Sequence, residues 1–414
     1  MLTPKLIIQK KKDYFFPNAM HFYKNPPHIV RGEGKNLYDD QGKCYLDFFA
    51  GVSVVNCGHC NPFINKRVAG QFSMLQHTST IYLTEPMVIL AERLAAVLPG
   101  DMQQTFFCSS GTEANEGALL LARLYTGKKG FLAFNGGLHG RSALTMSVTG
   151  IPMWRIDPFL DPDVYFAKGF MSHSANLEQA AEESLESVKA ILSEHGQKIA
   201  ACIVEPIQGN GGINIPPPDF FKRLQSLLND YGVLLIADEV QTGFARTGKM
   251  FAIEHFEVVP DIMTMAKALG NGVPIGAFSA RPHIAEAFDK PSASTLGGNP
   301  VSATAGLAVL DYIRIHNLCE WADKLGSYFL NKLTKLERKH SIIQDVRGLG
   351  LMLGMELENA DQTDAVLEEM KDLGFIIGKN GMNRNVIAFQ PPLIISEKDI
   401  DALCDNLDQV LSHY

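Results

Sequence analysis

Residues 233–243 read VLLIADEVQTG and residues 260–272 read PDIMTMAKALGNG. Each stretch contains a short apolar run of the length of a buried strand, and each run is closed by one charged residue. The charged residue is Asp238 in the first stretch and Lys267 in the second, where a Gly/Asn turn follows. A lysine at such a place is poorly positioned as a solvated surface charge. Both residues are therefore candidates for chemistry at the ends of strands.

Much of the chain between residues 86 and 300 repeats this construction, with short apolar strands that lack alternation and are separated by helices. Such strands indicate a mostly parallel sheet covered on both faces, so the fold class is α/β. Active sites of these sheets lie at the carboxyl ends of strands. Ser110, Glu205, Asp238 and Lys267 all follow such ends. The expected strands are residues 104–108, 131–134, 200–204 and 234–237, and the expected helices are residues 92–98, 113–125, 178–195 and 220–231.

The two ends of the chain carry a different pattern. Residues 36–43, NLYDDQGK, predict a strand, a turn and a second strand. Beyond Pro300 we expect helices at 301–316, 318–340, 361–373 and 397–412, with a strand pair within 342–356. This pattern predicts a smaller α+β domain built from both ends. The expected division is an N-terminal segment 1–62, a large domain 63–300 and a C-terminal small domain 301–414.

Composition excludes several classes of protein. The chain has 414 residues and a formal charge of −8 without a compensating basic face, which argues against a nucleic-acid partner. No apolar stretch reaches the roughly 20 residues of a membrane span, and the N-terminus lacks a signal-peptide pattern. Seven scattered cysteines, an odd number, suit reduced thiols. We expect a cytoplasmic protein without a membrane or nucleic-acid partner.

Two short motifs point to other chemistry and are set aside. Cys57-Gly58-His59-Cys60 has the spacing of a redox pair, but Asn61-Pro62 follows at once and the surrounding length does not fit a thioredoxin module. We favour a structural turn there over a redox or metal role, and we expect no metal site. Residues 348–354 read GLGLMLG. Their third glycine is not at the spacing that the fingerprint of nicotinamide-binding proteins requires, so a nicotinamide dehydrogenase is disfavoured.

An amine and a carboxylate at strand ends are the groups that pyridoxal phosphate requires. Lys267 can form a Schiff base with the cofactor's aldehyde, and Asp238 can keep the ring nitrogen protonated. Residues 109–116, SSGTEANE, open a helix whose free N–H groups and dipole attract a phosphate. The candidates for the phosphate contact are Ser110, Gly111 and Thr112.

Together these motifs resemble the class III, or ω-aminotransferase, family of fold-type I pyridoxal phosphate enzymes, and the resemblance covers nearly the whole chain. It implies that Lys267 holds the cofactor and moves the substrate proton. It also implies that Val240 packs on one face of the ring and that Gln241 bonds to the phenolic oxygen. His139 and the preceding Leu138 would line the other face, with Glu205 as a supporting residue beside Gln241.

The same resemblance implies the substrate contacts and the assembly. Arg141, in the His-Gly-Arg run that ends there, matches the family arginine that binds the substrate carboxylate, and Val52 is expected in the same pocket. Thr295, within residues 294–300 (STLGGNP), matches the family threonine that reaches the phosphate of the other subunit. If this carries over, the active site requires a homodimer.

Three positions depart from the family pattern. Leu138 stands where many members have an aromatic ring that stacks on the cofactor. Asn210 and Ala388 stand where members that use 2-oxoglutarate commonly carry a glutamate and an arginine, a switchable pair. Loss of the arginine contact is worth roughly 10- to 100-fold in affinity for a dicarboxylate. The acceptor expectation therefore shifts towards pyruvate or glyoxylate. Arg384 is close enough in sequence to substitute, but it is more typical of a loop surface.

The resemblance implies transfer of an amino group from an ω-amino acid or related amine to a 2-oxo acid, pyruvate above all. The donor would be of the 4-aminobutyrate, β-alanine or taurine type. Two alternatives stay open. A racemase, phospho-lyase or decarboxylase of the same fold would share every cofactor motif. A non-enzymatic binding protein with this fold is opposed by the intact Lys267, Asp238 and Thr295.

Overall fold

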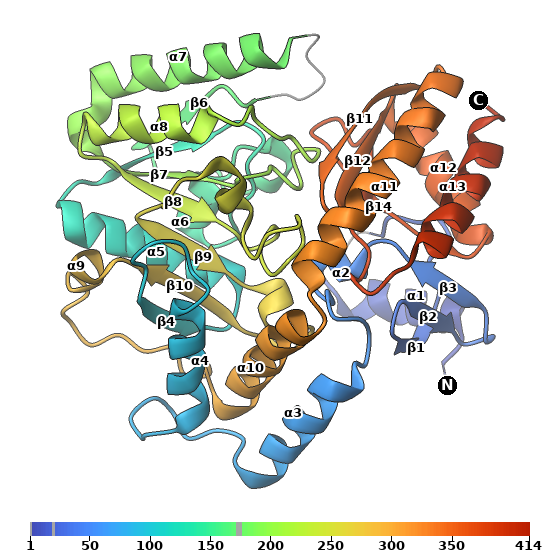
Figure 1. Ribbon diagram of the computed structural model, residues 1–414, viewed down its shortest axis with the longest axis horizontal. Helices are drawn as coiled ribbons and strands as arrows, with labels where there is room; N and C mark the ends of the chain where they lie inside the picture. The colour runs from blue at the N-terminus through green and yellow to red at the C-terminus, as the bar shows by residue number, and fades with distance from the viewer. Residues whose placement is uncertain (1, 19–20, 171–175) are drawn as a thin grey trace.

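The centre of the molecule is a seven-stranded sheet with the order β4-β10-β9-β8-β7-β5-β6 (Figure 1). The computed structural model describes residues 2–18, 21–170 and 176–414. Strand β10 runs antiparallel to both of its neighbours, and the strands from β9 to β6 are parallel. This confirms the predicted α/β class. The strands are β4 (Gln104–Cys108), β5 (Gly130–Phe134), β6 (Val164–Ala167), β7 (Ile199–Val204), β8 (Leu234–Asp238), β9 (Ile262–Met265) and β10 (Gly276–Ala280).

Successive side chains of each strand point to opposite faces of the sheet, and each face packs on its own helices. On one face Leu235 and Met263 share a core with α7 (Leu177–His195) and α8 (Phe220–Asn229). On the other face Ile236 and Ile262 share a core with α5 (Gly111–Thr126). Figure 1 shows α7 and α8 above the sheet and α5 below it. Coverage of both faces explains why these strands are apolar throughout.

Both ends of the chain form the smaller part of the molecule. Strand β13 pairs in parallel with β3, with Phe375 opposite Leu46, so one sheet contains residues from both ends. A second sheet, β11-β12-β15-β14, is antiparallel. The predicted α+β part built from both termini is confirmed, and its division at residues 62 and 300 stays a prediction. The strands are β1 (Ile29–Glu33), β2 (Asn36–Asp39), β3 (Cys44–Asp47), β11 (Ile343–Leu349), β12 (Met352–Leu357), β13 (Phe375–Ile376), β14 (Gly378–Asn380) and β15 (Val386–Phe389).

The four helices expected beyond Pro300 are confirmed within one residue at each end, whereas no helix was predicted at Pro4–Tyr14, Pro62–Met74, Ala143–Ser147 or Pro282–Ala285. The main difference is α4, which covers Glu85–Ala95 in place of the expected 92–98, because Thr84 and Pro86 supply its start. The antiparallel strand β10 had no sequence prediction. The helices are α1 (Pro4–Tyr14), α3 (Pro62–Met74), α4, α6 (Ala143–Ser147), α9 (Pro282–Ala285), α10 (Pro300–Ile315), α11 (Leu318–Lys339), α12 (Ala360–Asp372) and α13 (Glu397–Leu411).

The short element α2 (Ala50–Ser53) is a left-handed turn and not an ordinary helix. Its four φ angles are +49°, +62°, +68° and +59°. A β-branched residue such as Val52 rarely adopts this conformation, which costs on the order of 1–3 kcal/mol. Asp47 supports the turn, since its Oδ1 accepts hydrogen bonds from the N–H groups of Phe49 (2.8 Å) and Ala50 (2.9 Å).

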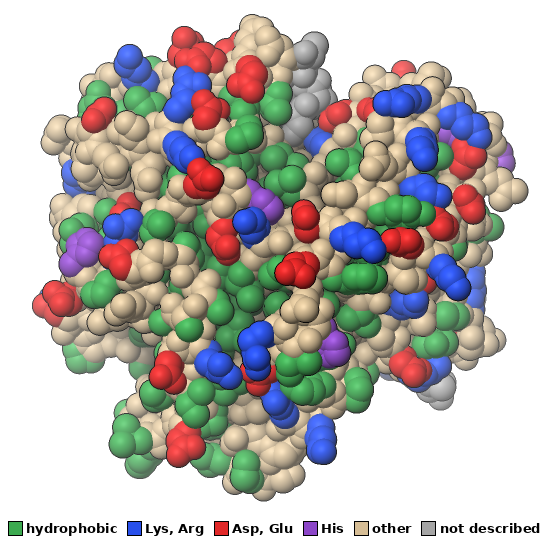
Figure 2. Space-filling view, viewed as in Figure 1, with side chains coloured by type: hydrophobic (Ala, Val, Ile, Leu, Met, Phe, Trp, Pro, Cys, Tyr) green, Lys and Arg blue, Asp and Glu red, His purple; other side chains and the backbone are tan. Residues whose placement is uncertain are grey.

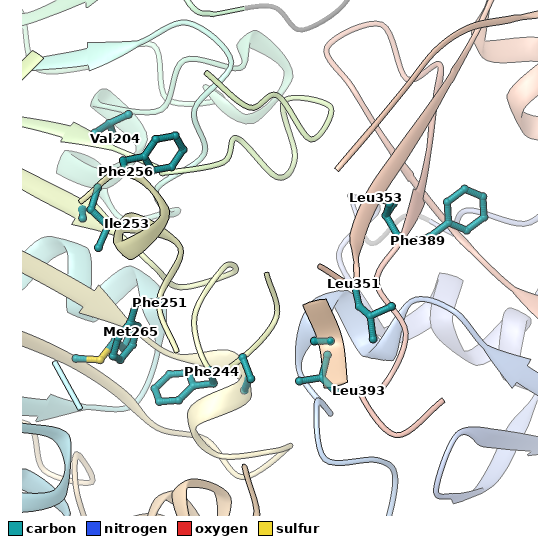
Figure 3. Packing of buried hydrophobic residues seen from close by; sticks show 14 of the residues in the cluster. Val204, Phe244, Phe251, Ile253, Phe256, Met265, Leu351, Leu353, Phe389 and Leu393 are labelled. Atoms are coloured by element: carbon teal, nitrogen blue, oxygen red, sulfur yellow. The ribbon is translucent and has the colours of Figure 1, made fainter. Parts of the chain in front are cut away.

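The large and small parts share one continuous core. Figure 3 shows Phe244 and Phe251 on the side of the large sheet, and Leu351 and Leu393 on the side of the small part. Arg246 is fully buried at this junction, and burial lowers its pKa to about 9. Its guanidinium donates to the carbonyls of Leu351 (2.9 Å) and Pro391 (2.6 Å). The junction is therefore fixed by packing and by a buried cation together.

The surface carries no segregated charge on the side drawn in Figure 2, where basic and acidic side chains are interspersed. Among the described residues, no helix has both the length and the apolar character needed to cross a bilayer.

Candidate active site

A cavity of about 370 Å³ lies where β8 and β9 end and α5 begins. Eight of the residues singled out by sequence line it, namely Ser110, Gly111, Thr112, Leu138, His139, Asp238, Val240 and Lys267. Val54, Ser109, Asn115, Gly140, Ala266 and residues 272–275 complete the lining. The carboxyl edge of the sheet therefore gathers side chains that are far apart in the sequence.

Lys267 lies immediately after β9, at the start of a short 3₁₀ turn (Lys267–Leu269). Its φ of +46° lies in the left-handed region, a costly conformation that clusters at functional sites. Burial lowers the pKa of its amine, and the nearby carboxylates of Asp238 and Glu205 partly oppose this shift. The environment thus makes the neutral amine more accessible than it is for a lysine in water.

Asp238, at the end of β8, is buried and held from several sides. Its Oδ2 accepts hydrogen bonds from Asn115 Nδ2 and His139 Nδ1, both at 2.8 Å. Its Oδ1 accepts from the N–H of Val240 (3.0 Å) and from the Thr264 hydroxyl (3.4 Å). These contacts leave the carboxylate with one fixed orientation at the edge of the cavity.

Only one of the two ring nitrogens of His139 forms a hydrogen bond within the described chain. Nδ1 donates to Asp238, because an ionised carboxylate can only accept. Nε2 is buried and has no partner among the residues that the structure describes. Asn115 bonds the backbone carbonyl of His139 (2.7 Å), and its own Oδ1 is likewise buried and unpartnered within the described chain. Two residues of the cavity lining thus each keep one buried polar atom without a partner in the described chain.

The first turn of α5 forms the opposite end of the cavity. The Ser110 hydroxyl caps the helix by accepting from the N–H of Glu113 (3.2 Å). The first N–H groups of a helix have no acceptor within it, so they are free to bind an anion. A Cβ on Gly111 would lie 2.8 Å from Val240 Cγ1, so this position requires glycine.

Glu205 lies behind the cavity wall, just past β7. Its carboxylate accepts from the N–H groups of Leu138 (2.8 Å) and Gly209 (3.0 Å). Burial raises the pKa of this carboxyl to about 7, while His139 lowers it and Asp238 raises it further. Glu205 thus anchors the loop that carries Leu138 and His139.

Gln241 is buried beside the cavity and does not line it. Its Nε2 donates to Gln390 Oε1 (3.1 Å), and its Oε1 accepts from Asn210 Nδ2 (3.5 Å). Ala388 is fully buried in an apolar cluster with Phe49, Ile207, Ile213 and Met352. The two positions at which other family members commonly carry a charged pair thus hold an amide and a methyl group.

Besides Glu205 and Gln241, three further predicted residues lie outside the cavity lining. Arg141 is exposed next to Gly140, and no ion pair is formed by it within the described chain. Val52 is half-buried in the left-handed turn, two residues before the lining residue Val54. Thr295 is exposed in a separate small hollow that residues 79, 80 and 297–300 also line.

Several residues of the cavity lining had no prediction from the sequence. Asn115 carried a signal, since an asparagine inside a helix is disfavoured unless its amide has a task. Residues 272–275 had no sequence signal that would mark them as part of the cavity, apart from their position shortly after Lys267. The Cys57–Cys60 turn has a structural role, because Cys57 N–H donates to Asn271 Oδ1 (2.9 Å) and Asn271 Nδ2 donates to the Gly58 carbonyl (3.0 Å). Burial raises the pKa of the Cys57 thiol, which disfavours the reactive thiolate.

The residues of the cavity fit pyridoxal phosphate. An amine, a fixed carboxylate and the free N–H groups of a helix end match the aldehyde, the ring nitrogen and the phosphate. Val240 and Leu138 are both half-buried in the cavity lining and offer apolar surface for the ring.

Comparisons with known proteins agree with this geometry. The model of the family described as "Aminotransferase class-III" matches residues 20–411. The "Alanine--glyoxylate aminotransferase 2 homolog 2, mitochondrial" of Arabidopsis thaliana is 42% identical, over 98% of this chain and 87% of the relative. The acetylornithine aminotransferase of Methanocaldococcus jannaschii is 39% identical, over 94% of each chain.

A solved amine transaminase from an uncultivated Pseudomonas species, in its pyridoxal phosphate-bound form, superposes with a TM-score of 0.91 at 27% identity. The match covers 97% of this chain and 98% of that one. Fold, cavity and relatives therefore agree. The chain belongs to the class III aminotransferases, enzymes that depend on pyridoxal phosphate.

Proposed function

We propose that this enzyme transfers an amino group from an ω-amino acid or related amine to a short monocarboxylic 2-oxo acid, pyruvate or glyoxylate. The observation that carries the acceptor is the chemistry of two positions: Asn210 is a neutral amide bonded to Gln241, and Ala388 is a methyl group buried in an apolar cluster. Neither side chain offers a cation to the second carboxylate of 2-oxoglutarate. The name of the Arabidopsis relative, which contains alanine and glyoxylate, supports an acceptor of this size.

The proposed cofactor contacts follow the cavity. Ser110, Gly111 and Thr112 bind the phosphate at the start of α5, and Asp238 binds the ring nitrogen. Val240 and Leu138 pack on the ring, and Gln241 donates to the phenolic oxygen. His139 and Glu205 support these contacts without touching the cofactor. His139 bonds Asp238, and Glu205 accepts from the N–H of Leu138 in the loop before Gly140.

When bound, pyridoxal phosphate supplies an aldehyde that captures amines and a ring that withdraws electrons from the substrate carbon. Lys267 Nζ would hold the cofactor. Once released, the same amine would take the proton from the donor carbon and deliver it to the cofactor. Its lowered pKa suits this task, because only the neutral amine can accept a proton. Asp238 keeps the proton on the ring nitrogen, and apolar Val54 and Leu138 limit the access of water.

The donor side rests on Arg141 and Val52. Arg141 is exposed and has no described ion-pair partner, so its guanidinium is available to a substrate carboxylate or sulfonate. Donors of the 4-aminobutyrate, β-alanine and taurine type carry such an anion at the far end from the amine. The acetylornithine aminotransferase relative favours a second candidate, a longer donor that also presents a terminal amine and a carboxylate.

We further propose that the enzyme is a cytoplasmic homodimer in which Thr295 of one subunit reaches the active site of the other. The hollow that contains Thr295 is lined by Ser79 and Thr80. Large apolar side chains next to it are exposed, including Ile81 (79%), Tyr82 (63%) and Leu83 (101%). An exposed apolar segment of this kind is typical of a surface that another subunit covers. A second copy would thus place Thr295 against a partner's site.

The first test is a spectral titration of the purified enzyme, loaded with cofactor, with candidate amines and no oxo acid. When the true donor is added, we expect the absorption band of the bound cofactor to disappear and pyridoxamine phosphate to form stoichiometrically. Turnover with that donor is then compared across pyruvate, glyoxylate and 2-oxoglutarate. Equal kcat/KM for 2-oxoglutarate and pyruvate would contradict the acceptor proposal, and a persistent band with a racemised, decarboxylated or eliminated product would contradict transamination.

A further inference from the structure

Gln390 directly follows β15 and is fully buried between the small part and the active site. Its backbone N–H donates to the Phe48 carbonyl (2.7 Å), so the main chain holds it against the N-terminal segment. Nothing in the mechanism above uses this residue. Only half of its side-chain amide is bonded: Oε1 has two donors, whereas Nε2 is buried and has no partner among the described residues. The contacts of Oε1 therefore indicate what the residue does.

The side-chain oxygen of Gln390 joins two elements. Oε1 accepts from the hydroxyl of Ser53 (2.9 Å) and from Nε2 of Gln241 (3.1 Å). Gln241 Oε1 in turn faces Asn210 Nδ2 (3.5 Å). We name Ser53, Gln390, Gln241 and Asn210 the amide relay. All four side chains are uncharged, so the relay's hydrogen bonds do not depend on a titrating group.

The relay decides which end of the Gln241 amide is free. The carbonyl oxygen is turned towards Asn210, and one N–H is bound by Gln390. An amide nitrogen has two N–H groups, so one of them remains. A flipped Gln241 would place its oxygen against Gln390 Oε1, which is two acceptors face to face. With Gln390 oriented as in this structure, its Oε1 therefore makes Gln241 present a donor and not an acceptor.

The other end of the relay reaches the left-handed turn Ala50–Ser53. Ser53 is fully buried, and its hydroxyl is bonded to Gln390 across the junction. The turn keeps Val52 at a φ of +68° and is followed directly by the lining residue Val54. Gln390 thus touches both the strained turn beside the pocket and the glutamine beside the cofactor site.

We propose that Gln390 is a positioning residue that orients the Gln241 amide towards the phenolic oxygen of the cofactor and ties this orientation to the Ala50–Ser53 turn. The inference rests on the role proposed above for Gln241, and it is independent of which donor and acceptor are used. The neutral relay includes Asn210, which stands where family members that use 2-oxoglutarate commonly carry a glutamate.

The test compares Gln390→Met, which keeps the volume and removes the acceptor, with Gln390→Glu, which keeps an oxygen for both donors. Exposed Gln344→Met is the matched control. One readout is the Kd of the apoenzyme for pyridoxal phosphate, and the other is the pH midpoint of the absorption band of the bound cofactor. Neither readout needs a substrate, so a wrong donor or acceptor leaves both unchanged.

We expect Gln390→Met to raise the Kd about tenfold, as the loss of one oriented hydrogen bond does, and to raise the pH midpoint by roughly one unit. Gln390→Glu should stay within about threefold of the wild-type Kd at pH 6, and Gln344→Met should match the wild type. In a Gln241→Met background, Gln390→Met should add less than about twofold, because its effect passes through Gln241.

Additive effects in the double variant, or an unchanged pH midpoint in Gln390→Met, would overturn the proposal. An unchanged midpoint in Gln241→Met alone would overturn it together with the role of Gln241. If Gln390→Met does not fold, Ser53→Ala removes the donor from the opposite side of the same oxygen. That variant should show the same two shifts at smaller size, about two- to threefold in Kd, and no shift would count against the relay.

Discussion

Replacing Ala388 by arginine introduces one half of the charged pair that 2-oxoglutarate-using family members commonly carry at residues 210 and 388, and we expect this half alone to destabilise the protein. Ala388 is fully buried among Phe49, Ile207, Ile213 and Met352, so a long cation must overpack an apolar cluster. Overpacking costs about 1–3 kcal/mol, and an unpaired buried charge costs about 3–5 kcal/mol. We expect Ala388→Arg to lose roughly 4 kcal/mol or more of stability.

The double variant Asn210→Glu/Ala388→Arg should recover most of that loss. Ile207 and Ile213 flank Asn210 in sequence and pack with Ala388, so residue 210 is placed to supply the missing carboxylate. A formed pair removes the unpaired charge, which returns roughly 3 kcal/mol. Asn210→Glu alone controls for the lost bond from Asn210 to Gln241.

Two assays follow these variants. Thermal midpoints of the apoenzymes report stability, and kcat/KM for 2-oxoglutarate relative to pyruvate reports the acceptor pocket. The single arginine variant should keep the wild-type ratio within about threefold, and the double variant should raise it about 10- to 100-fold. Wild-type stability of Ala388→Arg, or a large gain in 2-oxoglutarate use by that variant alone, would refute the reasoning.

Three further predictions concern the site and its assembly. Lys267→Ala should keep the fold by circular dichroism and abolish turnover, and normal turnover would end the assignment of this amine. Glu205 has a folded pKa of about 7, above its ordinary 4.5, so the folded state binds the extra proton and loses stability as pH rises from about 4.5 to 7. The thermal midpoint of Glu205→Gln should fall less steeply over that window, and an equal slope would contradict the shift. Leu83→Glu should shift the enzyme towards monomer in analytical ultracentrifugation and weaken cofactor affinity through Thr295, whereas Lys189→Glu, on the exposed face of α7, should change neither.

The large sheet was predictable because its signals are local. The apolar runs that end at Asp238 and Lys267 report burial and strand ends within a few residues. The same holds for Ser110–Thr112, where a glycine and a cap stand at a helix start. Together with the family resemblance, these local patterns predict eight of the residues that line the cavity.

The rest depends on partners far away in the chain. Nothing near Val52 predicts a left-handed turn, because a β-branched residue disfavours it and its support includes Gln390, 337 residues beyond Ser53. Similarly, β10 is antiparallel because it pairs with β4, which lies much earlier in the sequence. Such features follow from tertiary contacts that override local preference.

The parallel pairing of β3 with β13 has a consequence for synthesis on the ribosome. Leu46 emerges early, but its partner Phe375 is made near the end of translation. At about 5–20 residues per second, the nascent N-terminal strands wait at least tens of seconds for that partner, while the strands of the central sheet can already associate. Until Phe375 is made, one edge of β3 lacks the backbone partner that it has in the folded protein, and such an unpaired edge is open to pairing with other chains.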